Sequence, residues 1–174
     1  MATRSSRAYI RHMNSVMPMV PHERPLRPPL RPSSHELQAD IDVAAAGTVP
    51  VLITAPPGCA SVIVQAIAAR SHRDVIPVPA ASHDLLRAIA EERLGIRTRR
   101  RAILWLEEVH ELTPAHQAAV MRLVELGAAQ PQQALRIIAS SSADLMAMVE
   151  RGSFDDNLFY RLNAIHVVVR EDIK

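Results

Sequence analysis

Short apolar runs alternate with longer amphipathic segments along most of this 174-residue chain. The runs carry almost no charge, as expected for strands that are buried on both faces of a sheet. Between them, apolar residues recur at helical spacing, for example at Ile63, Ala66 and Ile67. Strands that alternate with helices predict βαβ units and a parallel sheet, so the predicted fold class is α/β. The predicted strands cover residues 51–53, 75–78, 102–106, 135–139 and 165–169.

The predicted helices have recognisable ends. Ser34 is a candidate N-cap for a helix with Leu37, Ile41 and Ala44 on one face. Thr113 with Pro114 begins a later helix, which Gly127 is expected to end and which turns Ala119, Val120, Leu123 and Val124 inward. The other helices are predicted over residues 60–70, from Ser82 to Gly95, and around Leu145, Met148 and Val149.

Proline marks two features of the chain. Pro77 lies within the strand predicted over residues 75–78 and has no N–H for a ladder, so this strand should lie at a sheet edge. Residues 1–33 hold six prolines and six arginines, opposed only by Glu23, and lack apolar periodicity. We therefore expect a disordered Arg/Pro-rich tail over residues 1–33 and one domain over residues 34–174.

Composition narrows the function classes. Hydrophobic residues make up 48% of the chain and aromatic residues only 3%, so the core must be aliphatic. The longest apolar stretches are too short to cross a membrane, and the single cysteine, Cys59, has no partner for a disulfide or a metal set. We therefore expect a cytoplasmic protein without a membrane segment. The net charge of +2 does not by itself indicate nucleic-acid binding, although arginines cluster again over residues 97–101.

Polar residues follow three of the predicted strands. Ligands of parallel α/β sheets bind beyond the carboxyl ends of the strands, so these residues mark the expected site. Residues 54–61 follow the first strand, Glu107 and Glu108 follow the third, and three serines at 140–142 follow the fourth. This is the layout of a phosphate-binding loop, a carboxylate pair for metal and water, and a polar sensor.

Four segments resemble the AAA+ ATPase domain of the sigma-54-dependent transcription activators, the bacterial enhancer-binding proteins. Residues 103–112 (ILWLEEVHEL) resemble the Walker B segment, and residues 135–145 (LRIIASSSADL) resemble the sensor-one strand. Residues 152–163 (GSFDDNLFYRLN) are similar to the segment with the arginine fingers, and residues 51–70 to the Walker A strand, loop and helix. The likeness runs in the family's order from about residue 34 to residue 170.

The resemblance implies a three-layer P-loop sheet flanked by helices, and a site for ATP and Mg²⁺ in which most ATP-handling residues are replaced. The nucleotide would contact the positions of Gly58, Cys59, Ala60, Ser61, Val62, Glu107 and Ser142.

The phosphate-binding loop departs furthest from the family. Ser61 stands where the family has the lysine that reaches the β- and γ-phosphates, and a hydroxyl cannot supply that charge. Ala55 and Ala60 replace two glycines, while Pro56 and Pro57 offer no N–H to a phosphate. We therefore expect binding of the γ-phosphate to be badly weakened.

The carboxylates and the fingers are altered as well. Glu107 matches the metal-side aspartate, so it remains a Mg²⁺ candidate with one methylene more, and Glu108 matches the water-polarising glutamate. The alternative for this pair is two solvated acids at a strand end. Ser142 replaces the sensor asparagine and makes fewer hydrogen bonds, and Asp155 replaces the first arginine finger and would repel a neighbour's γ-phosphate. Arg161 matches the second finger; it either acts in trans or anchors a helix.

Glu108 and Arg161 are thus expected to be vestigial catalytic residues. The family's GAFTGA loop, which touches sigma-54, is replaced by a direct bridge over residues 95–101, so we expect no direct contact with sigma-54. Beyond Arg170 we also see no helical lid and no DNA-binding helix-turn-helix.

Several functions remain open from the sequence. The leading hypothesis is a degenerate sigma-54-interaction domain, a pseudo-ATPase that acts in transcription regulation by association with an active activator or with itself. A second is weak binding of ATP or ADP as a structural ligand or switch. A third is a basic-tailed adaptor for nucleic acid or a protein, and a fourth is a gene fragment without a selected role.

Overall fold

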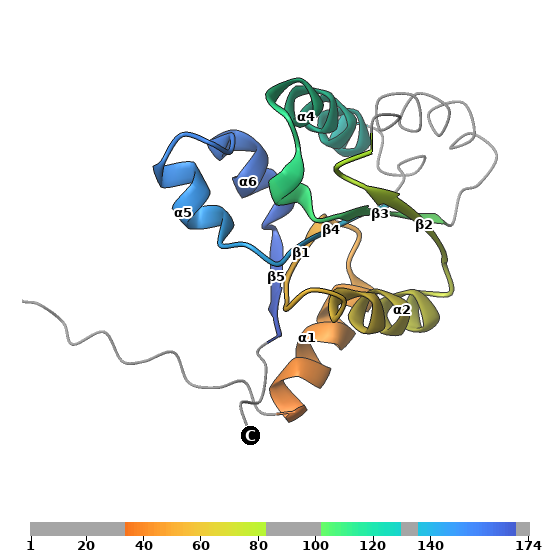
Figure 1. Cartoon of the computed structure of the whole chain (residues 1–174). Helices are drawn as coiled ribbons and strands as arrows, with labels where there is room; N and C mark the ends of the chain where they lie inside the picture. Colours follow the sequence, from red (N-terminus) through yellow and green to blue (C-terminus); the bar gives the residue numbers. More distant parts are fainter. Residues whose placement is uncertain (1–33, 83–101, 130–135, 170–174) are drawn as a thin grey trace, which may run out of the picture. The chain divides into compact units, whose positions relative to one another are not determined.

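The computed structural model describes residues 34–82, 102–129 and 136–169, which form a sheet with helices on both faces (Figure 1). Several predictions from the sequence lie outside these residues. They are the tail over residues 1–33, the helix that follows Ser82, and the bridge over residues 95–101. None of the helices in the described part of the chain is long and apolar enough to cross a membrane.

Five parallel strands form the sheet, in the order β2-β3-β4-β1-β5. This confirms the predicted α/β class, because each strand returns to the same direction after a connection along the chain. Strand β2 lies at an edge, as its proline predicts, with Pro77 opposite Trp105. The strands are β1 (Val51–Thr54), β2 (Asp74–Pro79), β3 (Ala102–Glu107), β4 (Arg136–Ser141) and β5 (Ile165–Val168).

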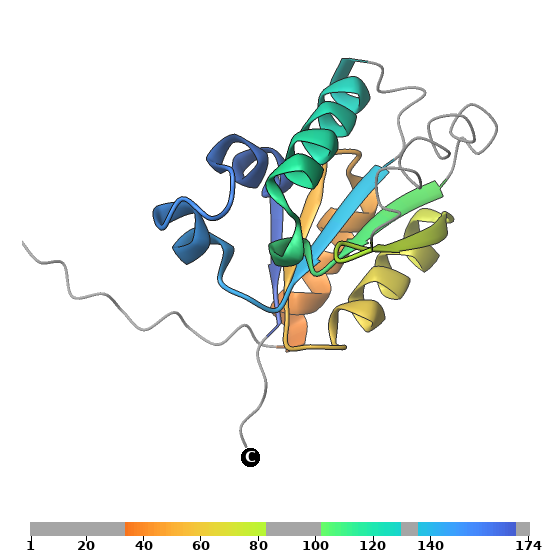
Figure 2. The same cartoon turned by 45° about the horizontal axis from the view of Figure 1, so that its top comes forward.

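Helices cover the two faces of the sheet and complete a three-layer arrangement. Helices α1 (Ser34–Ala46) and α2 (Ala60–Ser71) pack on one face. Helices α4 (Pro114–Ala129), α5 (Leu145–Glu150) and α6 (Asp156–Leu162) lie on the other, where α4 crosses in front of the strands in Figure 2. The three layers follow from strands that are apolar on both sides.

The sheet has an aliphatic core on each side. In β3, Ile103 faces α1 and α2, whereas Leu104 and Leu106 face α4 and α6, because successive side chains of a strand point to opposite faces. All three are fully buried, and each contributes roughly 1.5–3 kcal/mol by leaving water.

Helix α4 confirms one predicted end and corrects the other. It begins at Pro114, and the Thr113 hydroxyl accepts a hydrogen bond from the His116 N–H at 3.3 Å. The prediction that Gly127 ends the helix is wrong, since α4 continues to Ala129. A glycine inside a helix costs only about 1 kcal/mol relative to alanine. Burial of Val120 and Leu123 in the turns before it outweighs that cost.

Arg136 is a buried charge within the sheet that the sequence analysis treated only as part of a strand. It is 3% exposed, and its guanidinium donates hydrogen bonds to the carbonyl oxygens of Ala44 and Ala45. These carbonyls belong to the last turn of α1, where the helix supplies no N–H partner. Burial, together with the nearby charge of Arg73, lowers the pKa of Arg136 to about 10. Arg136 therefore fastens the C-terminal end of α1 to the central strand β4.

Candidate functional site

The predicted site residues lie together at the carboxyl ends of the central strands. Strands β3, β4 and β1 are neighbours, so their carboxyl ends bring together Glu107 and Glu108, the serines at 140–142, and the loop that follows Thr54. This juxtaposition is the one expected for a parallel sheet.

The loop between β1 and α2 closes in a tight turn. The Cys59 N–H donates to the Pro56 carbonyl at 3.0 Å, and Gly58 has a φ of +80°. Proline at the second position and a positive φ at the third are the features of a type II turn, so Pro57 and Gly58 suit this conformation. Cys59 precedes α2, is exposed, and caps the helix without a side-chain hydrogen bond. Pro56 and Pro57 thus shape the loop, but they remove N–H groups that a phosphate would need.

The start of α2 holds the remaining loop positions. The Ser61 hydroxyl donates to the Gly58 carbonyl at 3.0 Å, so the residue at the lysine position makes a contact inside the loop. Ala60 is buried, and Val62 is 70% exposed with a side chain that has no oxygen for a metal ion. This part of the site offers no side-chain cation to a phosphate.

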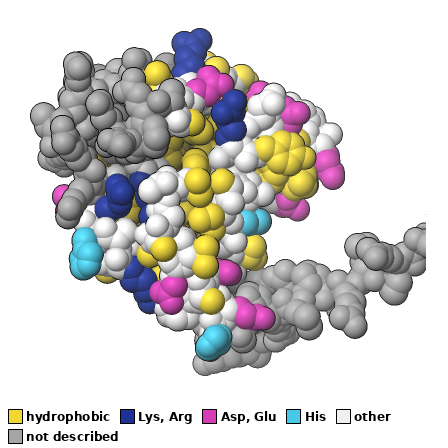
Figure 3. Space-filling model, turned by 180° about the vertical axis from the view of Figure 1, so that it is seen from behind, with side chains coloured by type: hydrophobic (Ala, Val, Ile, Leu, Met, Phe, Trp, Pro, Cys, Tyr) yellow, Lys and Arg dark blue, Asp and Glu magenta, His cyan; other side chains and the backbone are white. Residues whose placement is uncertain are grey.

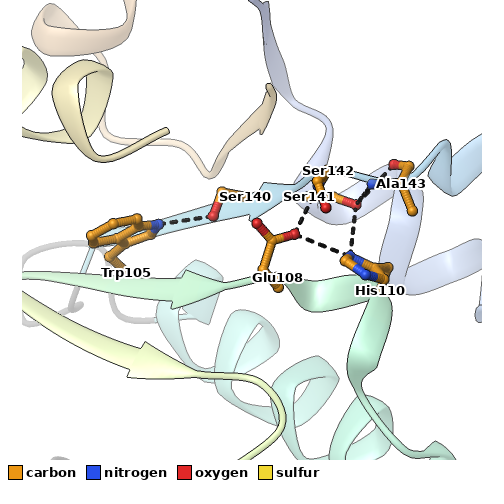
Figure 4. Close-up of polar contacts among 7 residues, drawn as sticks. All are labelled: Trp105, Glu108, His110, Ser140, Ser141, Ser142 and Ala143. Atoms are coloured by element: carbon orange, nitrogen blue, oxygen red, sulfur yellow. Dashed lines mark hydrogen bonds and ion pairs between the residues drawn. The ribbon is translucent and has the colours of Figure 1, made fainter. Parts of the chain in front are cut away.

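Glu108 has an unusual backbone and two polar partners. Its φ and ψ are 53° and 56°, in the left-handed region that few residues other than glycine adopt. Its Oε2 accepts a hydrogen bond from the Ser142 N–H at 2.8 Å and lies 3.2 Å from Nδ1 of His110 (Figure 4). The carboxylate therefore links the end of β3 to the turn after β4.

His110 lies in the short 3-10 helix η1 (Val109–Glu111) and contacts two acceptors. The Ser141 hydroxyl donates to the Ala143 carbonyl at 2.8 Å, so its oxygen is the acceptor towards Nδ1 of His110 at 3.3 Å (Figure 4). Because Glu108 and Ser141 both face Nδ1, that nitrogen carries the proton. A serine hydrolase needs its serine and its acid on opposite ring nitrogens, so this cluster is not a catalytic triad.

Ser140, the other serine of β4, is bonded to a side chain of the neighbouring strand β3. The Trp105 indole N–H donates to the buried Ser140 hydroxyl at 3.0 Å (Figure 4). Trp105 is the only tryptophan of the chain, and it lies two residues before Glu107. Its fluorescence therefore reports directly on this edge of the sheet.

Glu107, at the end of β3, stays a predicted ligand of Mg²⁺. Partial burial, and then the charge of Glu108, raise the pKa of Glu107 above its ordinary value. Among the residues that the structure describes, no group of three His, Cys, Asp or Glu side chains could hold a metal ion. A Mg²⁺ ion at Glu107 would need most of its six oxygen ligands from water or a bound phosphate.

We expect a Glu107→Gln variant to be slightly more stable than the wild type at pH 7, by at most a few tenths of a kcal/mol because solvent screens the charge. Since the folded pKa is raised, the charged carboxylate opposes folding above that pKa and not below the unfolded value of about 4.5. The difference should therefore vanish when urea unfolding is repeated near pH 4. A variant that is less stable at pH 7 would contradict this assignment, and Glu111→Gln, at an exposed position, is the control.

The arginine-finger segment is held by contacts within the chain. Asp155 is the N-cap of α6, and its Oδ1 accepts from the Leu158 N–H at 2.8 Å. Nη2 of Arg161 lies 3.4 Å from Oε1 of Glu125 on α4, and both side chains are about half exposed. The structure thus gives Asp155 a capping role and joins Arg161 to α4, while a role of Arg161 towards a neighbour stays a prediction.

Gln117 is an organising residue that the sequence analysis missed. It is 6% exposed on α4, and its Nε2 donates to the carbonyls of Leu112 at 3.0 Å and Ser153 at 3.4 Å. Its Oε1 accepts from the Asp155 N–H at 2.8 Å. A groove of about 540 Å³ lies beside it, between α4 and residues 152–155. The sequence did carry one sign that Gln117 is buried: it stands three residues before the inward-facing Val120, on the same face of the helix.

The parallel sheet, the loop and helix after β1 and the carboxylates after β3 define a P-loop α/β domain of the AAA+ class. The chain belongs to the Sigma-54 interaction domain family, whose sequence profile matches residues 31–171.

The chain is similar to several regulators over part of its length. It is 39% identical to the regulatory protein AtoC of Escherichia coli over 40% of this chain, and 37% identical to the nitrogen fixation protein AnfA of Azotobacter vinelandii over 38%. These matches span only 18% and 14% of the two relatives.

Solved structures share the fold. The ATP complex of NtrX from Brucella abortus superposes with a TM-score of 0.60 at 23% identity, covering 78% of this chain and 35% of NtrX. The P-loop NTPase domain of a sigma-54 activator from E. coli gives a TM-score of 0.58 at 12% identity, covering 77% of this chain and 93% of that domain.

Proposed function

We propose that this chain is a sigma-54-interaction domain that acts in transcription regulation by associating with other regulators, without hydrolysing ATP. Its family supports the regulatory role. The observation that carries the loss of hydrolysis is the state of Glu108, whose carboxylate binds the Ser142 N–H and faces His110 within the chain.

Charge considerations support the same proposal. Phosphoryl transfer depends on positive groups around the γ-phosphate, and an arginine finger alone contributes about 10³–10⁵ in rate. Here Ser61 and Asp155 occupy the positions of the lysine and the first finger, and each makes a hydrogen bond within the chain. The side chain of Val62 also has no oxygen to offer to a Mg²⁺ ion that would accompany the phosphates.

The proposed partner is an active sigma-54-dependent activator or a second copy of this chain. Arg161 and the surface around Glu107 are the proposed contacts, since Arg161 is exposed beside α4 and Glu107 lies at the strand ends. Direct contact with sigma-54 is not part of this proposal. On the described part of the face that Figure 3 shows, basic and acidic side chains are interspersed, which favours a protein partner over nucleic acid there.

A second candidate is weak binding of ATP or ADP as a structural ligand. The similarity in fold to NtrX, whose structures include complexes with ATP and with ADP, favours it. The N-terminal turn of α2 also lies at the strand ends, and such turns attract anions through their unpaired N–H groups.

Calorimetry with ATP and ADP in the presence of Mg²⁺ separates the two candidates. We expect no heat of binding up to about 1 mM nucleotide, the level that corresponds to about 4 kcal/mol of binding free energy. A Ser61→Lys variant is the matched test of the missing charge and should bind more tightly than the wild type.

The opposite result would be clear binding by the wild type that a Glu107→Ala variant weakens. It would favour the structural-ligand function, and turnover of ATP by the wild type would refute the proposal that the chain does not hydrolyse ATP.

A further inference from the structure

Residues 142–155, called the arm here, contain the turn after β4, helix α5 and the loop before α6. We infer that the segment from β3 to α4 clamps this arm at both ends, and that releasing either clamp opens the arm as a unit. This inference does not rest on the proposed function, because every contact involved lies within the chain.

The first clamp is Glu108. Its carboxylate accepts from the N–H of Ser142, the first residue of the arm, at 2.8 Å. His110 supports it from the other side at 3.2 Å and also contacts Ser141 at 3.3 Å. The left-handed backbone of Glu108 is unfavourable for a residue with a Cβ and persists only where surrounding contacts hold it. The hydrogen bonds of the Glu108 carboxylate therefore hold this residue in a backbone conformation that it would not otherwise adopt.

The second clamp is Gln117. Its amide binds the Ser153 carbonyl and the Asp155 N–H at the far end of the arm, and binds Leu112 in the segment before α4. Glu108, just after β3, and Gln117, in the first turn of α4, thus bind opposite ends of the arm. The groove beside Gln117 leaves this end of the arm accessible to solvent.

Between the clamps the arm is bonded to itself more than to the sheet. The Ser153 N–H donates to the Met148 carbonyl at 2.9 Å, the Gly152 N–H to the Val149 carbonyl at 2.9 Å, and Asp144 caps α5. In α5, Leu145 is buried and Met148 and Val149 are partly buried against the core, while Phe154 is buried near the second clamp. An element with few fully buried apolar residues and its own internal hydrogen bonds opens as one piece at a lower cost than the whole domain.

Opening the arm would affect α6. The arm ends at Asp155, which caps α6 and stands at the position of the first arginine finger. A change at Glu108 on the strand ends would thereby reach the exposed surface of α6. The arm is a conformational link between the candidate site and that surface.

Hydrogen exchange of the full chain tests the clamps. We expect Glu108→Ala to speed exchange by about tenfold at both ends of the arm, since a charged hydrogen bond is lost. The amides to follow are those of Ala143, Ala147, Met148, Gly152, Ser153 and Phe154. Gln117→Leu should accelerate the same amides at both ends of the arm. Glu108→Gln keeps an acceptor and should give a smaller effect. In the Glu108 variants the amides of α2 serve as a control and should change less than those of the arm, and the exposed-site variant Glu111→Ala should leave the arm unchanged.

Glu108→Gly separates the clamp from the backbone strain, because glycine adopts a φ of +53° without cost. If the side chain is the clamp, this variant also exposes the arm. Wild-type exchange in Glu108→Gly would overturn the inference, and so would acceleration that is confined to one end of the arm or, in the Glu108 variants, spread equally over α2.

Discussion

Gln117→Leu is expected to lower the free energy of unfolding by about 2–3 kcal/mol, one of the two largest effects we anticipate for single substitutions in this chain. Leucine has a similar size, so packing is largely kept, but three buried or half-buried backbone groups lose their partner. These groups are the carbonyls of Leu112 and Ser153 and the N–H of Asp155. Their desolvation is no longer offset, and this is the origin of the expected loss.

Urea unfolding followed by circular dichroism and by Trp105 fluorescence measures this effect. Gln65→Leu is the matched control, since Gln65 is exposed on α2 and the same exchange there should change stability by less than about 0.5 kcal/mol. Equal effects of the two substitutions would show that the amide of Gln117 does not hold the two loops.

Arg136→Ala is expected to cost about 2–4 kcal/mol, because the variant removes a buried side chain that donates hydrogen bonds and leaves a cavity. The carbonyls of Ala44 and Ala45 at the end of α1 lose their donors in the same step. Amides in the last turn of α1 should then exchange with water faster than those of α2. For this variant, urea unfolding measures the free energy of unfolding, and hydrogen exchange measures the opening of the last turn of α1.

Arg70→Ala provides the contrast for Arg136. Arg70 also contacts α1, through an ion pair with Asp42 at 2.8 Å, but this pair is exposed. Exposed pairs contribute about 0–1 kcal/mol, so this variant should remain close to the wild type. Arg136→Met, which fills the space without donors, distinguishes packing from hydrogen bonding. If this variant regains full stability, the capping of α1 by Arg136 contributes nothing.

The two variants act on different parts of the domain. Arg136 ties α1 to β4 on one face of the sheet, whereas Gln117 ties the loops beside α4 on the other. Their effects should add, since distant sites without shared partners behave independently.

The positions that resemble catalytic residues have internal partners in this structure. Ser61, Glu108 and Asp155 each contact a backbone group of the same chain, and Arg161 pairs with Glu125. Because these side chains are held by contacts within the chain, the site keeps its shape without bound ATP. This is the physical basis for proposing that the domain acts by association and not by hydrolysis of ATP.

The sequence alone determined the class of fold and most of its elements. Buried strands read as continuous apolar runs and helices as a 3.6-residue period, so local composition was sufficient for β1, β3 and β4. The edge position of β2 followed from one proline. The end of α4 did not follow from Gly127, because tertiary burial outweighed the local preference for a break.

The sequence also placed the carboxylates and serines at one edge, since parallel strands end together. It did not reveal which groups bind each other there. The contact between Glu108 and Ser142 joins residues 34 apart, and that between Gln117 and Asp155 joins residues 38 apart. Only tertiary structure decides such pairings, because a polar side chain satisfies its hydrogen bonds with whichever backbone groups packing brings within reach.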